Sequence, residues 1–545
     1  MKLKNSAIFF LLLAIIPAIQ GCKKSFTDLY NDPNHATSST APLIMGGILA
    51  NLTEGPNTIN ERRAQYYCSN YSYYGTNDYN LGAMTSYYTT IESSLKMEEA
   101  AIKQNLPKVN AYSALSKFFK AYLFTKMSMQ VGDIPLSQAL QGLGNLTPGY
   151  DTQKQVFQQS FIWLEEANAD LTTLIAANDR NLSGDFFFNN QLSKWQKLVN
   201  TLRLRLLIDL SKKAASDPDL RIAAQFGEIV NNPAKYPVMT DNTDNWQFVY
   251  QYPTNKYPSS PDTYGTDSKR FNTSATYIGL LTSLKDPRVF VTAEPAKIKV
   301  DAGISPTSFD AFVGADPGIS QDLMAKDASS IKKGRLVNGV LAPDTVIEKY
   351  SFINRKRYYE TYVGEPSIQI GYPELSFNIA EAINLGWITS GPKGNAEAYY
   401  QEGISASFQS YNIPASGNLS AYFLKGGSSS GNTYDLHLIP VNMSTYYAQP
   451  LVKYAGDPAI ALTQIRQQKY LALFRHSGLQ SYYNYRRTSV PVFTTGEGTL
   501  NSGRIPFRFQ YPAVEISSNT ANYNAALQRQ YGGNDDINAK MWLLQ

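Results

Sequence analysis

The stretch WQKLVNTLRLRLLIDL, residues 195–210, has the apolar pattern that recurs along most of this chain. Its large apolar residues recur at spacings of three and four: Trp195, Leu198, Leu202, Leu206 and Leu210. That period places them on one face of an α-helix, which we expect to run from Asn189 to Lys213. Arg203 and Arg205 lie off the apolar stripe, and we expect them to form structural ion pairs or to cap carbonyl groups.

The same helical period returns along most of the chain. It predicts four antiparallel helix pairs, in residues 85–131, 152–213, 372–408 and 458–486. Short loops between such helices favour packing as hairpins. Thr152, followed three residues later by a glutamine, predicts a capping box at the start of the second pair. Small residues at contact positions make the pairs look like degenerate tetratricopeptide units, with a generic helical bundle as the alternative.

The middle of the chain has a different composition. In residues 235–365 Gly, Pro, Asp and Ser become more frequent and the helical period fades, leaving short β-like runs at 246–250 and 345–347. We therefore predict an N-terminal helical half at 46–234, a loop-rich insertion or binding lobe at 235–365 and a C-terminal helical half at 366–545. The expected fold class is mainly α: four tetratricopeptide-like helix pairs with a loop-rich, irregular binding lobe.

The first residues have the pattern of a secretory signal. Two lysines precede the uncharged run AIFFLLLAIIPAI, residues 7–19, which is too short to span a bilayer. Cys22 directly follows Ile-Gln-Gly, which resembles a bacterial lipobox, in which the cysteine takes up lipid and begins the mature chain. We expect a lipoprotein signal peptide at 1–21, lipid attachment at Cys22 and a lipidated tether at 22–45. An ordinary signal with an incidental cysteine is the alternative.

The charge balance and the number of cysteines limit which partners and disulfides we expect. The 49 basic and 44 acidic residues form no concentrated basic block, so we expect no nucleic-acid partner. Only two cysteines are present. If Cys22 carries lipid, Cys68 has no disulfide partner, and we expect it to be a small buried apolar residue. No second apolar run is long enough to predict a transmembrane helix.

Catalytic motifs are missing from the sequence. The three histidines are isolated, and no zinc-protease, dithiol, serine-hydrolase or phosphate-loop motif occurs. We therefore expect no catalytic residue, no cofactor and no metal site. Residues 241–245 are rich in Asp and Asn but lack the spacing of a calcium loop. A glycosidase needs two carboxylates that flank one bond. We interpret pairs such as Glu98-Glu99 and Glu165-Glu166 as solvated faces of amphipathic helices.

Several short blocks, taken in order, resemble the SusD/RagB family of outer-membrane lipoproteins from Bacteroidetes, in particular its SusD-like branch. No single block is specific, but their order extends over most of the chain. The blocks are FTDL and NDPN at residues 26–34, GDIPLSQA at 132–139, YDTQKQV at 150–156, WQKLVNTLRLR at 195–205, AEA at 380–382, GISAS at 403–407, QQKY at 467–470 and YRRT at 485–488.

This resemblance implies a function in nutrient uptake. Members of the family capture glycans, and some capture peptides, and pass them to a TonB-dependent barrel of the SusC type, for which they form the lid. The chain is thus expected at the outer membrane, lipid-anchored and exposed at the cell surface. Surface-exported members often carry acidic residues after the lipidated cysteine, whereas here Lys23 and Lys24 follow it.

The candidate ligand-binding residues are mostly aromatic. The chain has 38 Tyr, 25 Phe and 5 Trp. Aromatic faces cover the apolar face of a sugar ring, and Asn, Asp or Arg bind its hydroxyl groups. Three loop-like stretches offer both: Tyr71, Tyr73, Tyr74, Asn77, Asp78 and Tyr79; Arg270 and Phe271; and Tyr359. The alternative is that these tyrosines pack the seam between helices and lobe or contact the barrel.

The function expected from the sequence is capture of an oligosaccharide or a peptide, without a catalytic step. Two other classes stay open from the residues alone. A lipid-anchored glycan hydrolase would need a carboxylate pair that faces one cleft. A structural outer-membrane scaffold would bury its aromatic loops against the body of the protein.

Overall fold

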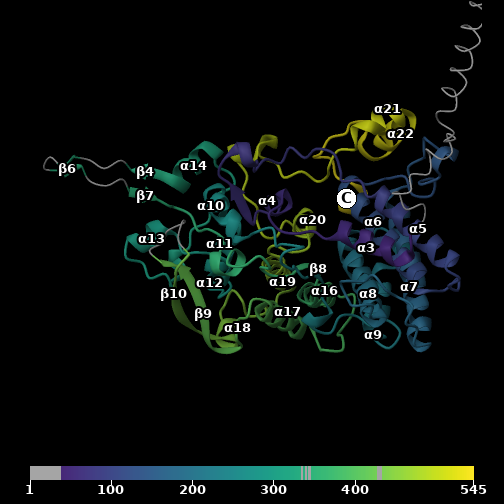
Figure 1. Cartoon of the computed structure of the whole chain (residues 1–545), viewed down its shortest axis with the longest axis horizontal. Helices are drawn as coiled ribbons and strands as arrows, with labels where there is room; N and C mark the ends of the chain where they lie inside the picture. Colours follow the sequence, from purple (N-terminus) through teal and green to yellow (C-terminus); the bar gives the residue numbers. More distant parts are fainter. Residues whose placement is uncertain (1–38, 333–335, 338–339, 342–344, 426–431) are drawn as a thin grey trace, which may run out of the picture.

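The computed structural model describes residues 39–332, 336–337, 340–341, 345–425 and 432–545 (Figure 1). The predicted signal peptide and Cys22 lie outside these residues. In the view of Figure 1, long helices from the N-terminal part stand on the right, and shorter helices with small sheets lie on the left. Among the described residues, no helix is long and apolar enough to cross a bilayer.

The N-terminal helical half is a row of helices in which neighbours along the chain pack side by side. The first two predicted pairs are confirmed, as α5–α6 and α7–α8. The helix α7 begins with the predicted capping box, because Thr152 and Gln155 bond each other's backbone N–H groups. The helices of this half are α3 (Ala41–Leu52), α5 (Tyr88–Lys103), α6 (Ala111–Val131), α7 (Gln153–Ala176), α8 (Leu192–Asp209) and α9 (Ile222–Asn231).

The C-terminal half supplies the other predicted helices. The pair α16 (Tyr372–Asn384) and α17 (Ala396–Ser410) packs as a hairpin. In the last pair, α19 (Pro458–Ala472) packs on α16 and α17, whereas α20 (Gln480–Thr488) contacts α8. The fourth pair therefore contacts both halves. The tail adds α21 (Ala513–Ser518) and α22 (Thr520–Tyr531).

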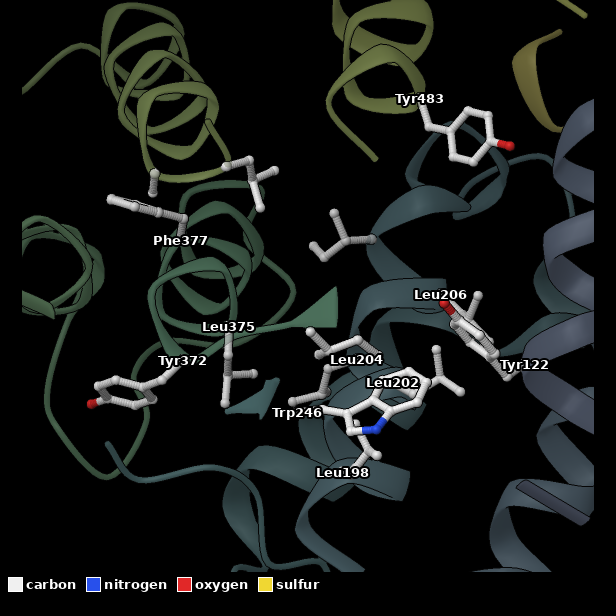
Figure 2. Close-up of a cluster of buried hydrophobic side chains, with 14 of the residues drawn as sticks. Tyr122, Leu198, Leu202, Leu204, Leu206, Trp246, Tyr372, Leu375, Phe377 and Tyr483 are labelled. Carbon is white, nitrogen blue, oxygen red and sulfur yellow. The ribbon is translucent and has the colours of Figure 1, made fainter. Parts of the chain in front are cut away.

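The helix α8 is more central than its apolar stripe predicted. From Leu198 to Asp209 every residue is buried, including both arginines. Figure 2 shows the reason: leucines of α8 lie between Tyr122 of α6 on one side and Leu375 of α16 on the other. Arg203 pairs with Glu165 of α7, and Arg205 pairs with Glu374 of α16. The expectation of structural ion pairs is thus confirmed, and they join α8 to neighbours on two sides.

A fully buried carboxylate joins the C-terminal helices. Glu381 of α16 lies within 2.7 Å of Arg487, 2.9 Å of Arg466 and 3.1 Å of Lys469. Burial alone would raise the pKa of Glu381, but these three cations outweigh it and hold that pKa well below its usual range. Arg486, beside this group in sequence, donates to the carbonyl oxygens of Phe507 and Met129.

The lobe consists of short helices and two-stranded antiparallel sheets, and besides residues 235–365 it includes segments at 59–69, 367–370, 416–424 and 434–447. The β-like run at 345–347 is confirmed as a strand, and the run at 246–250 is confirmed over its first three residues. The helices are α4 (Ile59–Arg63), α10 (Pro261–Arg270), α11 (Ala275–Ser283), α12 (Val289–Thr292), α13 (Lys297–Asp301), α14 (Gln321–Ser329), α15 (Arg355–Tyr358) and α18 (Met443–Tyr447). The strand pairs are β1 (Tyr67–Ser69) with β3 (Phe271–Thr273), β2 (Trp246–Phe248) with β8 (Ser367–Ile370), β4 (Ser330–Lys332) with β7 (Thr345–Ile347), β5 (Leu336–Val337) with β6 (Val340–Leu341), and β9 (Ser416–Leu424) with β10 (Tyr434–Asn442).

The hairpin β9–β10 is a feature that the sequence analysis missed. It lies within the predicted C-terminal helical half, but it packs against α12 and α15, so in space it extends the lobe. Its sequence does carry a signal, because Leu419, Ala421 and Phe423 alternate with exposed residues and are buried.

Candidate functional site

Three exposed tyrosines form the aromatic cluster of this protein: Tyr71, Tyr73 and Tyr74. Their side chains are 53%, 79% and 43% exposed. The rings of Tyr73 and Tyr74 are 4.9 Å apart and perpendicular, and Tyr71 is 5.6 Å from Tyr74. The cluster follows β1 in a single 3₁₀ turn, which Gly75 ends at a φ of +155°. These rings offer faces in different directions to an incoming ligand.

Arg270 completes the cluster from a distant part of the sequence. Its guanidinium carbon lies 3.4 Å from the centroid of the Tyr74 ring, close enough for a cation–π contact. The pairing of β1 with β3 brings the two together, since Ser69 is opposite Phe271. The Arg270 carbonyl oxygen accepts from the Asn70 N–H at 2.6 Å. Phe271 itself is half-buried and packs on Tyr67.

The other predicted residues of this stretch support the loop rather than face solvent. Asn77 is buried, where it accepts from the Ser69 N–H at 2.7 Å and donates to the Ser69 carbonyl at 2.9 Å. Tyr79 is buried and donates to the Arg63 carbonyl at 2.9 Å. Asp78 is half-buried and accepts from the Asn80 N–H. These bonds fix the turn that carries the aromatic cluster.

Tyr359 is buried at a different place. It packs edge-on against Tyr264 of α10, with 5.2 Å between ring centroids. Burial raises the pKa of its hydroxyl. The structure therefore brings Arg270 and Phe271 to the tyrosines at 71–74, but it places Tyr359 beneath α10, away from solvent.

A second aromatic pair was not predicted as a pair: Tyr252 is 59% exposed, and Tyr362, in the same loop-like stretch as Tyr359, is half-buried. Tyr252 and Tyr362 stack at 4.7 Å, and the Lys256 ammonium lies 4.8 Å from the centroid of Tyr362. The Tyr362 hydroxyl donates to Asp262, at the start of α10. Because Arg270 ends the same helix, aromatic groups lie near both of its ends. The signal in the sequence was two tyrosines in loop-rich segments, but nothing there indicated that they meet.

The Glu165 carboxylate and the Cys68 thiol do not belong to the aromatic cluster. Glu165 is engaged by Arg203 and by the Tyr236 hydroxyl, and the cations and hydroxyl outweigh burial to lower its pKa. Cys68 is buried, as expected, and burial raises the pKa of its thiol. Within the described ranges, no group of three or more His, Cys, Asp or Glu side chains is arranged to hold a metal ion.

Comparison with known proteins identifies relatives over nearly the whole chain. The profile of a SusD-like family, described as starch-binding and associating with the outer membrane, matches residues 33–512. A SusD homologue from Bacteroides fragilis has 30% sequence identity and a TM-score of 0.76, covering 93% of this chain and 100% of its own. A search of curated protein sequences found no match.

Two further solved structures have the same fold. An outer-membrane protein from Bacteroides vulgatus, described in terms of nutrient binding, has 27% identity and a TM-score of 0.74, covering 93% of this chain and 100% of that one. A chitin-binding SusD homologue from Flavobacterium johnsoniae has 19% identity and a TM-score of 0.66, covering 93% and 98%.

Proposed function

This chain belongs to the SusD-like family of nutrient- or glycan-binding outer-membrane proteins, and we propose that it captures an oligosaccharide on the aromatic cluster. It then delivers this ligand to a SusC-type TonB-dependent transporter, for which it forms the lid. The observation that carries the proposal is the exposure of Tyr71, Tyr73 and Tyr74 beside Arg270.

The exposure of three adjacent aromatic rings costs free energy. Large aromatic side chains normally gain free energy by burial, about 1.5–3 kcal/mol for a ring of this size. Three adjacent rings exposed in one short turn forgo that gain, and such a patch marks a binding surface. Sugar rings cover aromatic faces, and the Arg270 guanidinium supplies donors for hydroxyl groups. A peptide is the second class of ligand that the same groups would take.

The site of action follows from the N-terminal segment. We propose that Cys22 carries the lipid, which holds the protein at the outer face of the outer membrane. The binding surface then lies at the mouth of the transporter, and the ligand passes from one to the other without a catalytic step.

Calorimetric titration with maltoheptaose and with chitohexaose tests the ligand proposal. We expect at least one of them to bind, and Tyr73→Ala to weaken that binding about tenfold, or ~1.4 kcal/mol. Phe186→Ala is the control, because Phe186 is 44% exposed, close to the 43% of Tyr74, but does not belong to the aromatic cluster. If peptides bind and neither saccharide does, the ligand class is peptide. If neither saccharides nor peptides bind, the proposal of ligand capture is refuted.

A pull-down of the intact lipoprotein from detergent-solubilised outer membranes tests the partner. We expect a large barrel protein in comparable amount, identified by mass spectrometry. Absence of such a partner, together with protection of the protein from protease on whole cells, would contradict the lid function and surface exposure.

A further inference from the structure

A second concave site lies where the helical body meets the lobe. It is a cleft of about 810 Å³, and its walls come from the end of α17, the segment before β8, α15, β9 and the turn at Asn242–Asp244. It shares no residue with the aromatic cluster. In Figure 1, α17 and β9 lie along the lower edge of the molecule, whereas α14 lies at the upper edge.

Three polar atoms in the lining have no hydrogen-bond partner among the described residues. They are the Tyr411 hydroxyl, Oε1 of Glu365 and Oδ1 of Asn242. Tyr411 is 2% exposed and Glu365 is 8% exposed. Leaving such a buried group unpaired costs about 1–3 kcal/mol, so each one calls for an explanation. All three atoms belong to residues that line the same cleft, which points to a ligand that approaches from the cleft and supplies their partners.

The same three side chains are held in place by their other contacts. Oε2 of Glu365 accepts from Nε of Arg357 at 2.8 Å. The amide nitrogen of Asn242 donates to the Ala406 carbonyl at 2.9 Å. The Arg357 guanidinium carbon lies 4.8 Å from the centroid of the Tyr411 ring. The orphaned atoms are therefore fixed before any ligand arrives, which reduces the entropy lost on binding.

The charge of the cleft favours a neutral ligand. Arg357 and Glu365 compensate each other at 2.7 Å. Lys356 lies 3.4 Å from Glu360, which also pairs with Arg355 at 3.0 Å, so a small positive excess remains at the edge of the cleft. Burial lowers the pKa of His476, so this lining residue adds no charge at neutral pH. Most other polar lining groups are amides and hydroxyls, and Phe290 and Tyr422 add aromatic rings. Donors, acceptors and aromatic carbon with little net charge are the surface that a sugar ring complements.

We propose that this cleft is a second saccharide-binding site, for one or two sugar rings, that works independently of the aromatic cluster. Its volume lies within the range of about 300–1,000 Å³ that small-molecule sites occupy. Glu365 and Asn242 accept hydrogen bonds from sugar hydroxyl groups, and the Tyr411 hydroxyl donates one.

Saturation-transfer NMR with maltose, cellobiose and N,N′-diacetylchitobiose tests this site. The experiments use the whole protein carrying Tyr73→Ala, so that the aromatic cluster is weakened. We expect at least one disaccharide to bind. In that background Tyr411→Phe should raise the Kd of that disaccharide at least fivefold, because it removes the hydroxyl that donates to the ligand. The substitution removes no hydrogen bond within the described protein. Ser420→Trp, at an exposed position of the lining, should abolish binding by filling the cleft.

The matched control is Tyr358→Phe. Its hydroxyl is also buried and unpartnered within the described structure, but it lies outside the cleft. That variant should bind as its parent does. Loss of all disaccharide binding on Tyr73→Ala alone would overturn the second site and leave the aromatic cluster as the binding surface. Unchanged binding in both cleft variants, or binding of triglycine but of no disaccharide, would overturn it as well.

Discussion

The ion pairs buried in the helical body and the tyrosines exposed in the lobe are both placed where side chains of their kind are costly. In the body, Arg205, Glu374 and Glu381 are buried and ion-paired. In the lobe, Tyr73 and Tyr74 are exposed, although rings of this size usually gain by burial. These ion pairs are costly to bury, and these rings are costly to expose.

The difference shows what each region is built to do. Buried ion pairs contribute little net stability, but removing one partner is strongly destabilising. They join specific helices, so they fix how α8, α16, α19 and α20 meet. Exposed rings contribute nothing comparable to folding and are available to a ligand. Substitutions in the body should thus change stability, and substitutions in the aromatic cluster should change binding.

The largest effect is expected from Glu381→Gln in the body. The change leaves three buried cations without their carboxylate and should lower the free energy of unfolding by about 3–5 kcal/mol. Denaturant unfolding followed by circular dichroism measures it. Glu92→Gln is the control, since Glu92 pairs with Lys96 on an exposed helix surface and should cost less than about 0.5 kcal/mol. Equal losses of unfolding free energy in both variants would show that the buried ion pairs matter no more for stability than an exposed one.

The stability lost in Glu381→Gln should depend on pH. The folded-state pKa of Glu381 lies well below the ordinary value of 4.5. Its contribution to stability is therefore complete above about pH 4.5 and declines as the pH falls from there toward the folded pKa. The gap between wild type and Glu381→Gln should be constant from pH 6 to 8 and shrink below about pH 4.5. A gap that does not change down to pH 3 would contradict this assignment.

A smaller effect, on both stability and oligosaccharide affinity, is expected in the turn that carries the aromatic cluster. Asn77→Ala removes two hydrogen bonds to the Ser69 backbone, worth about 2 kcal/mol together. The turn that carries Tyr73 should loosen, so oligosaccharide affinity should fall severalfold along with stability. Thermal unfolding and calorimetric titration measure the two. The control Tyr73→Ala should lower affinity while changing stability by less than about 0.5 kcal/mol, and a comparable loss of stability there would refute the division of roles.

The sequence predicted the body better than the lobe, for a physical reason. Helical period is a local property, so the boundaries of α7 and α16 follow from residues a few positions apart. Exposure in the lobe depends on distant partners. Tyr79 and Tyr73 look alike in sequence, but only Tyr79 meets the Arg63 carbonyl and is buried. Tyr359 is covered by Tyr264 in the same way.

The cleft was beyond the reach of pattern analysis altogether. Its lining joins Asn242, Glu365 and Tyr411 from three separate segments, and each is an ordinary polar residue where it stands in the chain. By contrast, Arg270 was a candidate from the sequence, yet its contact with Tyr74 depends on the pairing of β1 with β3. Strand pairs between segments 200 residues apart leave no local period to detect.

The smallest effect is expected at the predicted capping box of the body. Thr152→Ala removes the side-chain acceptor for the Gln155 N–H at the start of α7 and should lower the free energy of unfolding by about 1 kcal/mol. Thr173→Ala is the matched control, because Thr173 is exposed near the end of the same helix, where alanine is the better helix former. That control should be neutral or slightly stabilising, as chemical denaturation would show. Because the cap lies far from the aromatic cluster in sequence and belongs to the body, oligosaccharide affinity should be unchanged in both variants. A change in affinity would mean that body and lobe are coupled more tightly than their separate chemistry indicates.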